Sequence, residues 1–424
     1  MGATKRPEYD APPPTRSATV VAKPLDPEHP KRPLPPVKLS ADPIDDALKR
    51  LLHFRSPEIP VVSVYWSVPE DLGQVKAGKS LLHDAAKAVR ERADSHDLSH
   101  DARMSLRADA DRIVELDLLV PFMQGRTVAF FRCSHLDFEE AVVVPSWVRD
   151  RVEVDATPYI RPLVAVLDES HRYAVAVVDR ERGRLYEFYL GALEAKDRED
   201  GRALRNPNYA YGDKEHNVHN KAEELAKRHY RQTASALEHF VKEKNIELVV
   251  VGGHEDTVPA FLDQLSHELR KKVVGTFIVD PHTLTPAIAR DSAQHSIDEY
   301  ERTEERELVA QAMERVATGG LGAVGLDWCL QAVDALAIEH LLVQPDVSAP
   351  GWTCDSCGWL GLQGGDCPVD GHRTRQTADV IDDMAAKVLD TSGHVEHVWA
   401  DTPLGDHTVA ALLRFPVPQP PALD

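Results

Sequence analysis

The sequence contains no apolar run long enough to cross a membrane. Hydrophobic residues make up 42% of the 424 residues and the mean hydropathy is −0.35, whereas a membrane-spanning helix needs about 20 consecutive apolar residues. The first seven residues also lack the apolar stretch and the small-residue cleavage site of a secretory signal. We therefore expect a soluble, cytoplasmic protein with no membrane partner.

Cysteine and basic charge are also scarce. Five cysteines at irregular spacing provide no disulfide framework, and we expect Cys133 and Cys329 to be plain buried thiols. The chain carries 49 Lys and Arg against 69 Asp and Glu, and this excess of acid repels phosphate. The totals oppose indiscriminate binding to nucleic acid, DNA included, so any RNA contact must be local.

The length and the order of periodic segments predict three α/β domains. Residues 1–40 are rich in proline and lack apolar periodicity, which predicts a disordered tail. An N-terminal α/β domain is expected over residues 41–155, with a helical hairpin broken near residues 94–97. A middle domain follows over residues 156–286. A C-terminal α/β/α domain is expected over residues 287–420.

The middle domain is predicted to hold a mixed sheet covered by helices. Three apolar, branched segments in quick succession, residues 163–168, 172–179 and 183–190, indicate an antiparallel meander. Later strands near residues 247–251 and 273–279 alternate with helices, which adds parallel partners. Asp168, Asp179 and Asp280 each end a predicted strand; they could hold a metal, although turn formation is the commoner role of such a residue.

The C-terminal domain contains two features that resemble binding motifs. A glycine-rich segment at residues 319–325 precedes a helix but lacks the Lys-Ser/Thr of a phosphate-binding loop, so we interpret it as a loop between helices. An insert at residues 350–373 contains Cys354 and Cys357 at zinc-knuckle spacing, and Cys367 can supply a third thiolate. His372 is chemically the better fourth ligand, whereas Asp370 stands where a second Cys-x2-Cys pair would end. We predict one structural zinc ion.

A polar stretch between Asn206 and Arg231 reverses the sign of the chain's charge. Residues 200–232 hold seven Lys or Arg against five Asp or Glu, together with three histidines. Turn residues open it, and Ala222, Leu225, Ala226 and Tyr230 then recur at helical spacing. The pattern predicts a loop over residues 205–220 that leads into a long helix. Such a helix suits either an ordinary solvated face or a contact with RNA phosphates.

In domain order and in its successive segments, the chain after residue 40 resembles the bacterial branch of the archaeo-eukaryotic class-1 peptide chain release factor superfamily. The resemblance rests on residues 163–190, on the loop and helix through Tyr230, on residues 248–253, and on residues 322–333 before the strand at 338–343. In that superfamily the central loop carries Gly-Gly-Gln and enters the ribosomal peptidyl transferase centre. Here no glutamine occurs between Leu190 and Arg231, and the first domain lacks the Asn-Ile-Lys-Ser codon-reading signature.

Within this branch the chain resembles the Balon-type ribosome hibernation factors, which respond to stress. The resemblance implies a protein without catalytic residues that occupies the A site of idle ribosomes and contacts 23S and 16S rRNA, with delivery by elongation factor Tu as an option. It also implies that the central loop and its helix meet rRNA through phosphate contacts and stacking, carried by Tyr211, Gly212, Lys214, His216, Asn217, His219, Lys221, Lys227, Arg228 and Arg231.

Two other functions stay open at this point. The chain could be a peptidyl-tRNA hydrolase for ribosome rescue or release, in which His216 or His219 helps to position water in place of glutamine. It could also be an interaction protein without ribosome affinity. A release assay separates the first alternative from a binding protein, and sedimentation with ribosomes tests the second.

Overall fold

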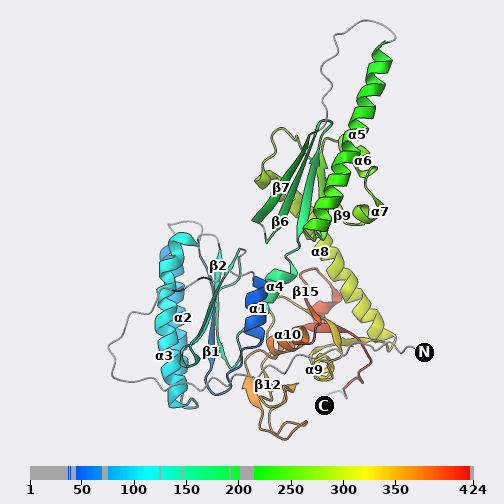
Figure 1. The fold of residues 1–424 in the computed structure, drawn as a ribbon. Coiled ribbons are helices and arrows are strands. Elements are labelled where there is room, and N and C mark those ends of the chain that lie inside the picture. The colour runs from blue at the N-terminus through cyan, green and yellow to red at the C-terminus, as the bar shows by residue number, and fades with distance from the viewer. Residues whose placement is uncertain are drawn as a thin grey trace, which may run out of the picture.

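The computed structural model describes residues 37, 39, 44–68, 75–123, 126–145, 147–190, 192–200 and 214–420. Within them the chain forms three larger sheets, each covered by helices, and a small three-stranded sheet (Figure 1). The predicted N-terminal tail over residues 1–40 lies almost entirely outside this part of the chain. The described helices include none that is both long and apolar enough to cross a membrane.

The first sheet has the strand order β3-β2-β1-β4 and is antiparallel throughout. The helices α2 (Val75–Ala93) and α3 (His100–Val114) form the predicted hairpin and cover one face, while α1 (Ile44–Leu52) covers the other. The strands are β1 (Val61–Ser67), β2 (Thr127–Cys133), β3 (Phe138–Val144) and β4 (Arg151–Asp155). The strand β4 was not predicted, because it is short and polar and only half-buried.

The middle sheet is mixed, as predicted, with the order β7-β6-β5-β8-β9. Strands β5 (Tyr173–Val178), β6 (Arg182–Tyr189) and β7 (Ala192–Asp200) form the antiparallel meander, and β8 (Leu248–Gly253) and β9 (Val273–Ile278) add parallel partners. One face is covered by α5 (Lys214–Glu243), α6 (Thr257–Leu262) and α7 (His267–Lys271). The first half of α8 (Pro286–Ala317) covers the other face.

The helix α8 connects the middle sheet to the third sheet (Figure 1). Ala289, Ala293 and Ile297 pack under the middle sheet, whereas Val309 and Ala312 pack against the third. The third sheet has the order β10-β16-β11-β15, with α9 (Leu326–Asp334) and α10 (Val380–Asp390) on its opposite face. Its strands are β10 (Gly322–Val324), β11 (Ile338–Val343), β15 (His394–His397) and β16 (Val409–Leu413). This arrangement confirms the predicted α/β/α domain.

Two predicted elements are wrong. Residues 163–168, predicted as the first strand of the meander, lie in the helix α4 (Arg161–Asp168), which has Pro162 in its first turn and packs against α1 and the third sheet. A short apolar run fits a buried strand and a helix equally well, and the proline decides for the helix. The glycine-rich segment is not only a loop, because Gly322 begins β10, which pairs with β16.

Candidate functional site

The helix α5 runs from Lys214 to Glu243 and extends beyond the end of the middle sheet (Figure 1). Ala226, Tyr230, Ala234 and Leu237 recur on one face and are buried under the sheet together with Phe261 of α6. This spacing is the helical period that the sequence predicts. Leu225, which the sequence also predicts to be buried, is only half-buried, so the buried stripe is narrower toward the N-terminal end of α5.

The opposite face of α5 presents cations to solvent. Lys227 and Arg228 are exposed, and neither has an ion-pair partner among the described residues. Arg231 is exposed as well, and its Nε donates to the neutral amide of Gln264 at 3.2 Å. No described carboxylate forms an ion pair with these three side chains, although the exposed Glu223 and Glu224 lie one turn earlier on the same helix. The three cations are therefore available to an anionic partner.

The predicted tip of this site is only partly described. Tyr211 and Gly212 lie outside the described residues, while Lys214, His216, Asn217, His219 and Lys221 belong to the first turns of α5 by their backbone, with side chains outside the description. His229, one of the three histidines of the stretch, is buried at 3% exposure and does not face solvent.

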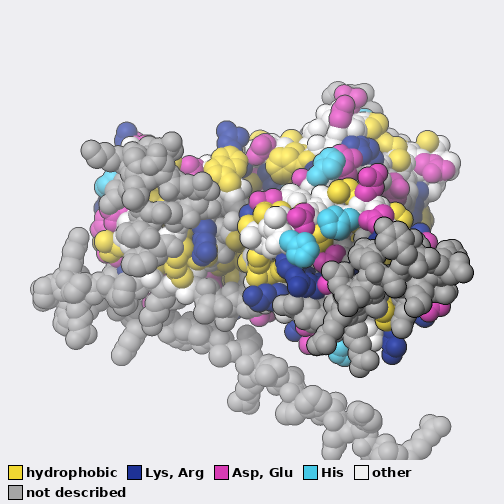
Figure 2. All heavy atoms as spheres, turned by 90° about the horizontal axis from the view of Figure 1, so that it is seen from above, with side chains coloured by type: hydrophobic (Ala, Val, Ile, Leu, Met, Phe, Trp, Pro, Cys, Tyr) yellow, Lys and Arg dark blue, Asp and Glu magenta, His cyan; other side chains and the backbone are white. Residues whose placement is uncertain are grey.

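The surrounding surface does not form one broad basic face. Where side chains are coloured in Figure 2, basic, acidic and histidine side chains are interspersed. The chain has a net charge of −20, so the exposed cations of α5 form a local basic group on a protein that is acidic as a whole.

The cysteine insert forms two matching turns between the short strands β12 (Gly351–Thr353), β13 (Leu360–Gly361) and β14 (Arg375–Thr377). In the first turn the amide of Gly358 donates to the carbonyl of Cys354 at 2.8 Å, and in the second the amide of Gly371 donates to the carbonyl of Cys367 at 2.9 Å. Both glycines have a positive φ, 73° and 74°, which a residue with a Cβ rarely adopts. Two such turns facing one another are typical of a metal-binding knuckle pair.

The two turns bring Cys354, Cys357, Cys367 and Asp370 together, with one ligand atom of each within 4.8 Å of the others. The sulfurs of Cys357 and Cys367 are 3.5 Å apart, and the Cys354 sulfur lies 3.5 Å from Asp370 Oδ1. Around a tetrahedral zinc ion with bonds of ~2.3 Å, sulfurs are separated by about 3.8 Å, so the group is suited in size and chemistry to hold one ion. All four positions would be filled by protein ligands, which is the arrangement of a structural site.

His372 is outside this group. Its side chain is 66% exposed, and its Nδ1 lies 3.3 Å from Asp370 Oδ2. Its backbone amide donates to Asp370 Oδ1 at 3.1 Å, and this hydrogen bond is the largest of several effects that hold the pKa of the Asp370 carboxyl below its usual value. The structure therefore gathers the alternative fourth ligand, Asp370, with the cysteines.

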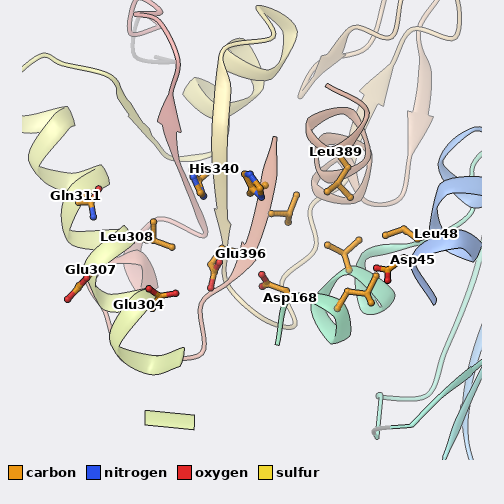
Figure 3. Close-up of a pocket in the computed structure, with 14 residues that line it drawn as sticks. Asp45, Leu48, Asp168, Glu304, Glu307, Leu308, Gln311, His340, Leu389 and Glu396 are labelled. Carbon is orange, nitrogen blue, oxygen red and sulfur yellow. The ribbon is translucent and has the colours of Figure 1, made fainter. Parts of the chain in front are cut away.

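Carboxyl groups gather around a cavity of about 520 Å³ between α4, α8 and the third sheet (Figure 3). Burial, together with the nearby carboxylates, raises the pKa of Asp168 to about 8, although the hydrogen bond from the backbone amide of His397 acts in the opposite direction. Burial and Asp168 raise that of Glu396 to about 9. The stacked rings of His340 and His394 line the same cavity, 4.9 Å apart. Both carboxyls are thus largely protonated at neutral pH.

The aspartates that the sequence singled out serve local structure. Asp179 Oδ1 accepts from the amides of Glu181 and Arg182 at 2.6 and 2.7 Å, and Asp280 Oδ1 accepts from the amide of His282 at 2.9 Å. Asp168 ends a helix instead of a strand and accepts from the amide of His397 at 2.7 Å. Among the described residues none of the three belongs to a metal-binding group.

Comparison with known proteins finds a related family for the middle part of the chain. Residues 158–297 match the model of bacterial archaeo-eukaryotic release factor family 10. This segment contains the middle sheet, α5 and the start of α8. Over these residues the chain is similar to the bacterial branch of the archaeo-eukaryotic release factor superfamily, which supports the resemblance noted in the sequence.

Curated relatives match the chain over part of their length. Peptide chain release factor subunit 1 of Methanopyrus kandleri is 28% identical over 226 residues, which cover 49% of this chain and 52% of the relative. The pelota homolog of Pyrococcus furiosus is 29% identical over 140 residues, covering 32% and 39%. The chain thus spans about half the length, or less, of these two relatives. The solved structure of Archaeoglobus fulgidus Pelota covers 69% of this chain and 81% of its own, with 16% identity and a TM-score of 0.34.

Proposed function

We propose that this protein is a ribosome-binding translation factor whose α5 helix contacts rRNA without catalysing peptide release. The observation that carries the proposal is the exposed, unneutralised set of Lys227, Arg228 and Arg231 on the helix that projects from the middle sheet. The similarity of residues 158–297 to a release factor family supports a ribosomal partner over another polyanion. A helix with a buried apolar stripe holds these cations at fixed spacing, which suits a regular phosphate backbone.

We further propose that the protein occupies the A site of idle ribosomes as a hibernation factor. The support is the resemblance of the sequence to the Balon-type factors and the lack of a glutamine between Leu190 and Arg231. The ribosomal contacts would include 23S and 16S rRNA, and elongation factor Tu is the proposed delivery partner. In this proposal the Cys354 cluster holds a structural zinc ion that braces the third domain.

A double charge reversal, Lys227→Glu with Arg228→Glu, tests ribosome binding. Charge-assisted contacts to phosphate are worth roughly 1.5–3 kcal/mol each, so losing two of them should lower the affinity for 70S ribosomes by about a hundredfold or more. Folding should hardly change, because both side chains are exposed. The measurement is co-sedimentation with ribosomes at several salt concentrations, where the parent should lose affinity more steeply than the variant.

The matched control is Arg270→Glu with Lys271→Glu on α7. These two side chains are also exposed, lie in the same domain and change the charge by the same amount. This control should bind ribosomes nearly as well as the parent. Equal binding by the α5 variant and the parent at matched ionic strength would move the binding site away from α5.

A further inference from the structure

A second cavity, of about 490 Å³, lies where three parts of the chain meet. Its walls come from the segment that joins β3 to β4 and from α4, from the end of β15 and the residues that follow β11 and β15, and from residues of α8 and next to the middle sheet. No described residue of α5 or of the cysteine cluster lines it, so it is separate from both sites above. Its volume lies in the range of pockets that enclose small organic ligands.

Two tryptophans on different sides of the cavity are exposed. Trp147, between β3 and β4, is 75% exposed, and Trp399, beyond β15, is 51% exposed. Large exposed aromatic rings that share one cavity offer flat faces on which another planar ring can stack. This part of the cavity therefore favours a ligand with an aromatic ring.

One of the charged residues that line the cavity is left free to hold an anion. Arg149, Arg151 and Arg161 line it together with Glu169 and Asp346. Arg151 is paired with Glu153 at 2.7 Å and Arg161 with Asp379 at 3.1 Å, while Glu169 is paired with Arg302 at 2.7 Å. Arg149 is exposed and has no ion-pair partner among the described residues. The guanidinium of Arg149 is therefore available to a phosphate or a carboxylate.

Two buried side chains of the cavity have unused hydrogen-bonding atoms. Arg161 is 4% exposed; its Nη2 contacts Asp379 at 3.1 Å, but its Nη1 has no hydrogen-bond partner in the described part of the chain. His397 is also 4% exposed, and neither ring nitrogen has a hydrogen-bond partner there, although Nδ1 lies 3.6 Å from Asp168 Oδ2. Leaving such atoms unpaired costs free energy that a ligand could recover.

The imidazole of His397 is neutral at physiological pH. Burial, followed by the nearby charge of Arg161, lowers the pKa of His397 to about 4. A neutral imidazole offers one donor and one acceptor, which is the pairing that the edge of a nucleobase presents. The guanidinium of Arg161 offers only donors.

We propose that this cavity binds a nucleoside phosphate, with the base stacked on Trp147 or Trp399 and paired with His397, and with the phosphate held by Arg149 and Arg161. An inorganic anion alone would leave both indoles and most of the volume unfilled. A purely apolar ligand would leave Arg161 Nη1 and His397 buried without partners. The nucleotide can be a free molecule or an unstacked residue of an RNA strand, since both carry the same chemistry.

The test is isothermal titration calorimetry of the full chain, without ribosomes, against ATP, GTP and a ten-nucleotide single-stranded RNA. We expect one saturable site per chain for a mononucleotide, for the RNA or for both. Trp147→Ala and Arg149→Glu should each raise the dissociation constant by about tenfold or more, because one stacked base or one phosphate contact is lost. Both side chains are exposed, so both variants should fold.

Phe415→Ala and Arg126→Glu are the matched controls, because both side chains are exposed and neither lines the cavity. Lys227→Glu with Arg228→Glu removes binding of RNA to α5, so RNA that still binds this variant and is lost with Trp147→Ala belongs to the cavity. If the cavity variants lose binding of the RNA but the parent binds neither ATP nor GTP, the ligand is a nucleotide of an RNA strand. If the cavity variants lose binding of ATP or GTP, the ligand is a free nucleotide. Absence of saturable binding for all three probes, or binding unchanged in both cavity variants, overturns the proposal.

Discussion

Asp370 holds, in the second cysteine turn, the place that Cys357 holds in the first. Each of these residues is followed by a glycine of positive φ whose amide bonds back to the first cysteine of its turn. The sequence alone favours His372 on chemical grounds, because imidazole is a commoner zinc ligand than a lone carboxylate in such a site. The backbone decides the geometry, since the turn directs the residue before the glycine toward the other cysteines.

We expect Asp370→Ala to lower the zinc content of the purified protein well below about one ion per chain, and His372→Ala to leave it unchanged. Zinc bound by fewer than four protein ligands is held less tightly and is removed sooner by a chelator. Metal analysis after dialysis against a mild chelator under reducing conditions measures the difference. Cys133→Ser is the control, because this thiol is buried far along the chain from the insert. Equal zinc loss in both variants would make His372 a ligand.

The protonated carboxyls of Asp168 and Glu396 make stability depend on pH. Their pKa values in the folded chain, about 8 and about 9, lie above the unfolded values of about 4. Between about pH 4 and the pKa values of the folded chain, the folded protein therefore binds more protons than the unfolded chain. The contribution of these two carboxyls to the free energy of unfolding is thus largest at low pH, and it is lost as the pH rises through the pKa values of the folded chain.

The double substitution Asp168→Asn with Glu396→Gln should remove the loss of stability at high pH, because neither new side chain can ionise. At pH 8 we expect the double variant to be more stable than the parent by several kcal/mol, because each unit of raised pKa corresponds to about 1.4 kcal/mol, while at pH 4 the two should differ little. Urea unfolding followed by circular dichroism at both pH values measures the change. Glu307→Gln, on the exposed rim of the same cavity, should keep the pH dependence of the parent. A double variant that is less stable than the parent at pH 8 would contradict this account.

Periodicity predicted the long helices and most strands because one face of each is buried. In α5 the apolar stripe through Ala226, Tyr230 and Leu237 repeats at helical spacing, so the sequence is sufficient to predict the helix. In α4 it is not, because eight residues with a continuous apolar run carry no clear period. The polar strands β4 and β7 escaped prediction for a related reason, since their pairing depends on neighbours and not on their own pattern.

The exposed cations of α5 and the cysteines of the insert could be found from the sequence, because each set is contiguous along the chain. The second cavity could not. Trp147, Arg161 and His397 are separated by long stretches of chain, and only the packing of α4 against the third sheet brings them to one place. No local pattern distinguishes Arg161 from any other arginine at the start of a helix.

The chain as a whole combines the fold of a release factor relative with a central loop that lacks the hydrolytic glutamine. Residues 205–213 of this loop lie outside the described residues, and α5 begins directly after them at Lys214. Peptide release needs a group that positions water beside the ester of peptidyl-tRNA. Glu215 and His216, at the start of α5, do not repeat the Gly-Gly-Gln sequence, and we predict that they do not admit this water.

We therefore expect no peptidyl-tRNA hydrolysis above the spontaneous rate when the protein is added to ribosomes that carry peptidyl-tRNA. Binding and release must be measured on the same ribosomes, so that inactivity is not confused with failure to bind. His216→Ala and His219→Ala should change neither the release rate nor the fold, because neither residue has a chemical role in this account. A clear release activity that either substitution abolishes would make the protein an enzyme in which histidine replaces glutamine, and ribosome binding through Lys227 and Arg228 would then serve catalysis.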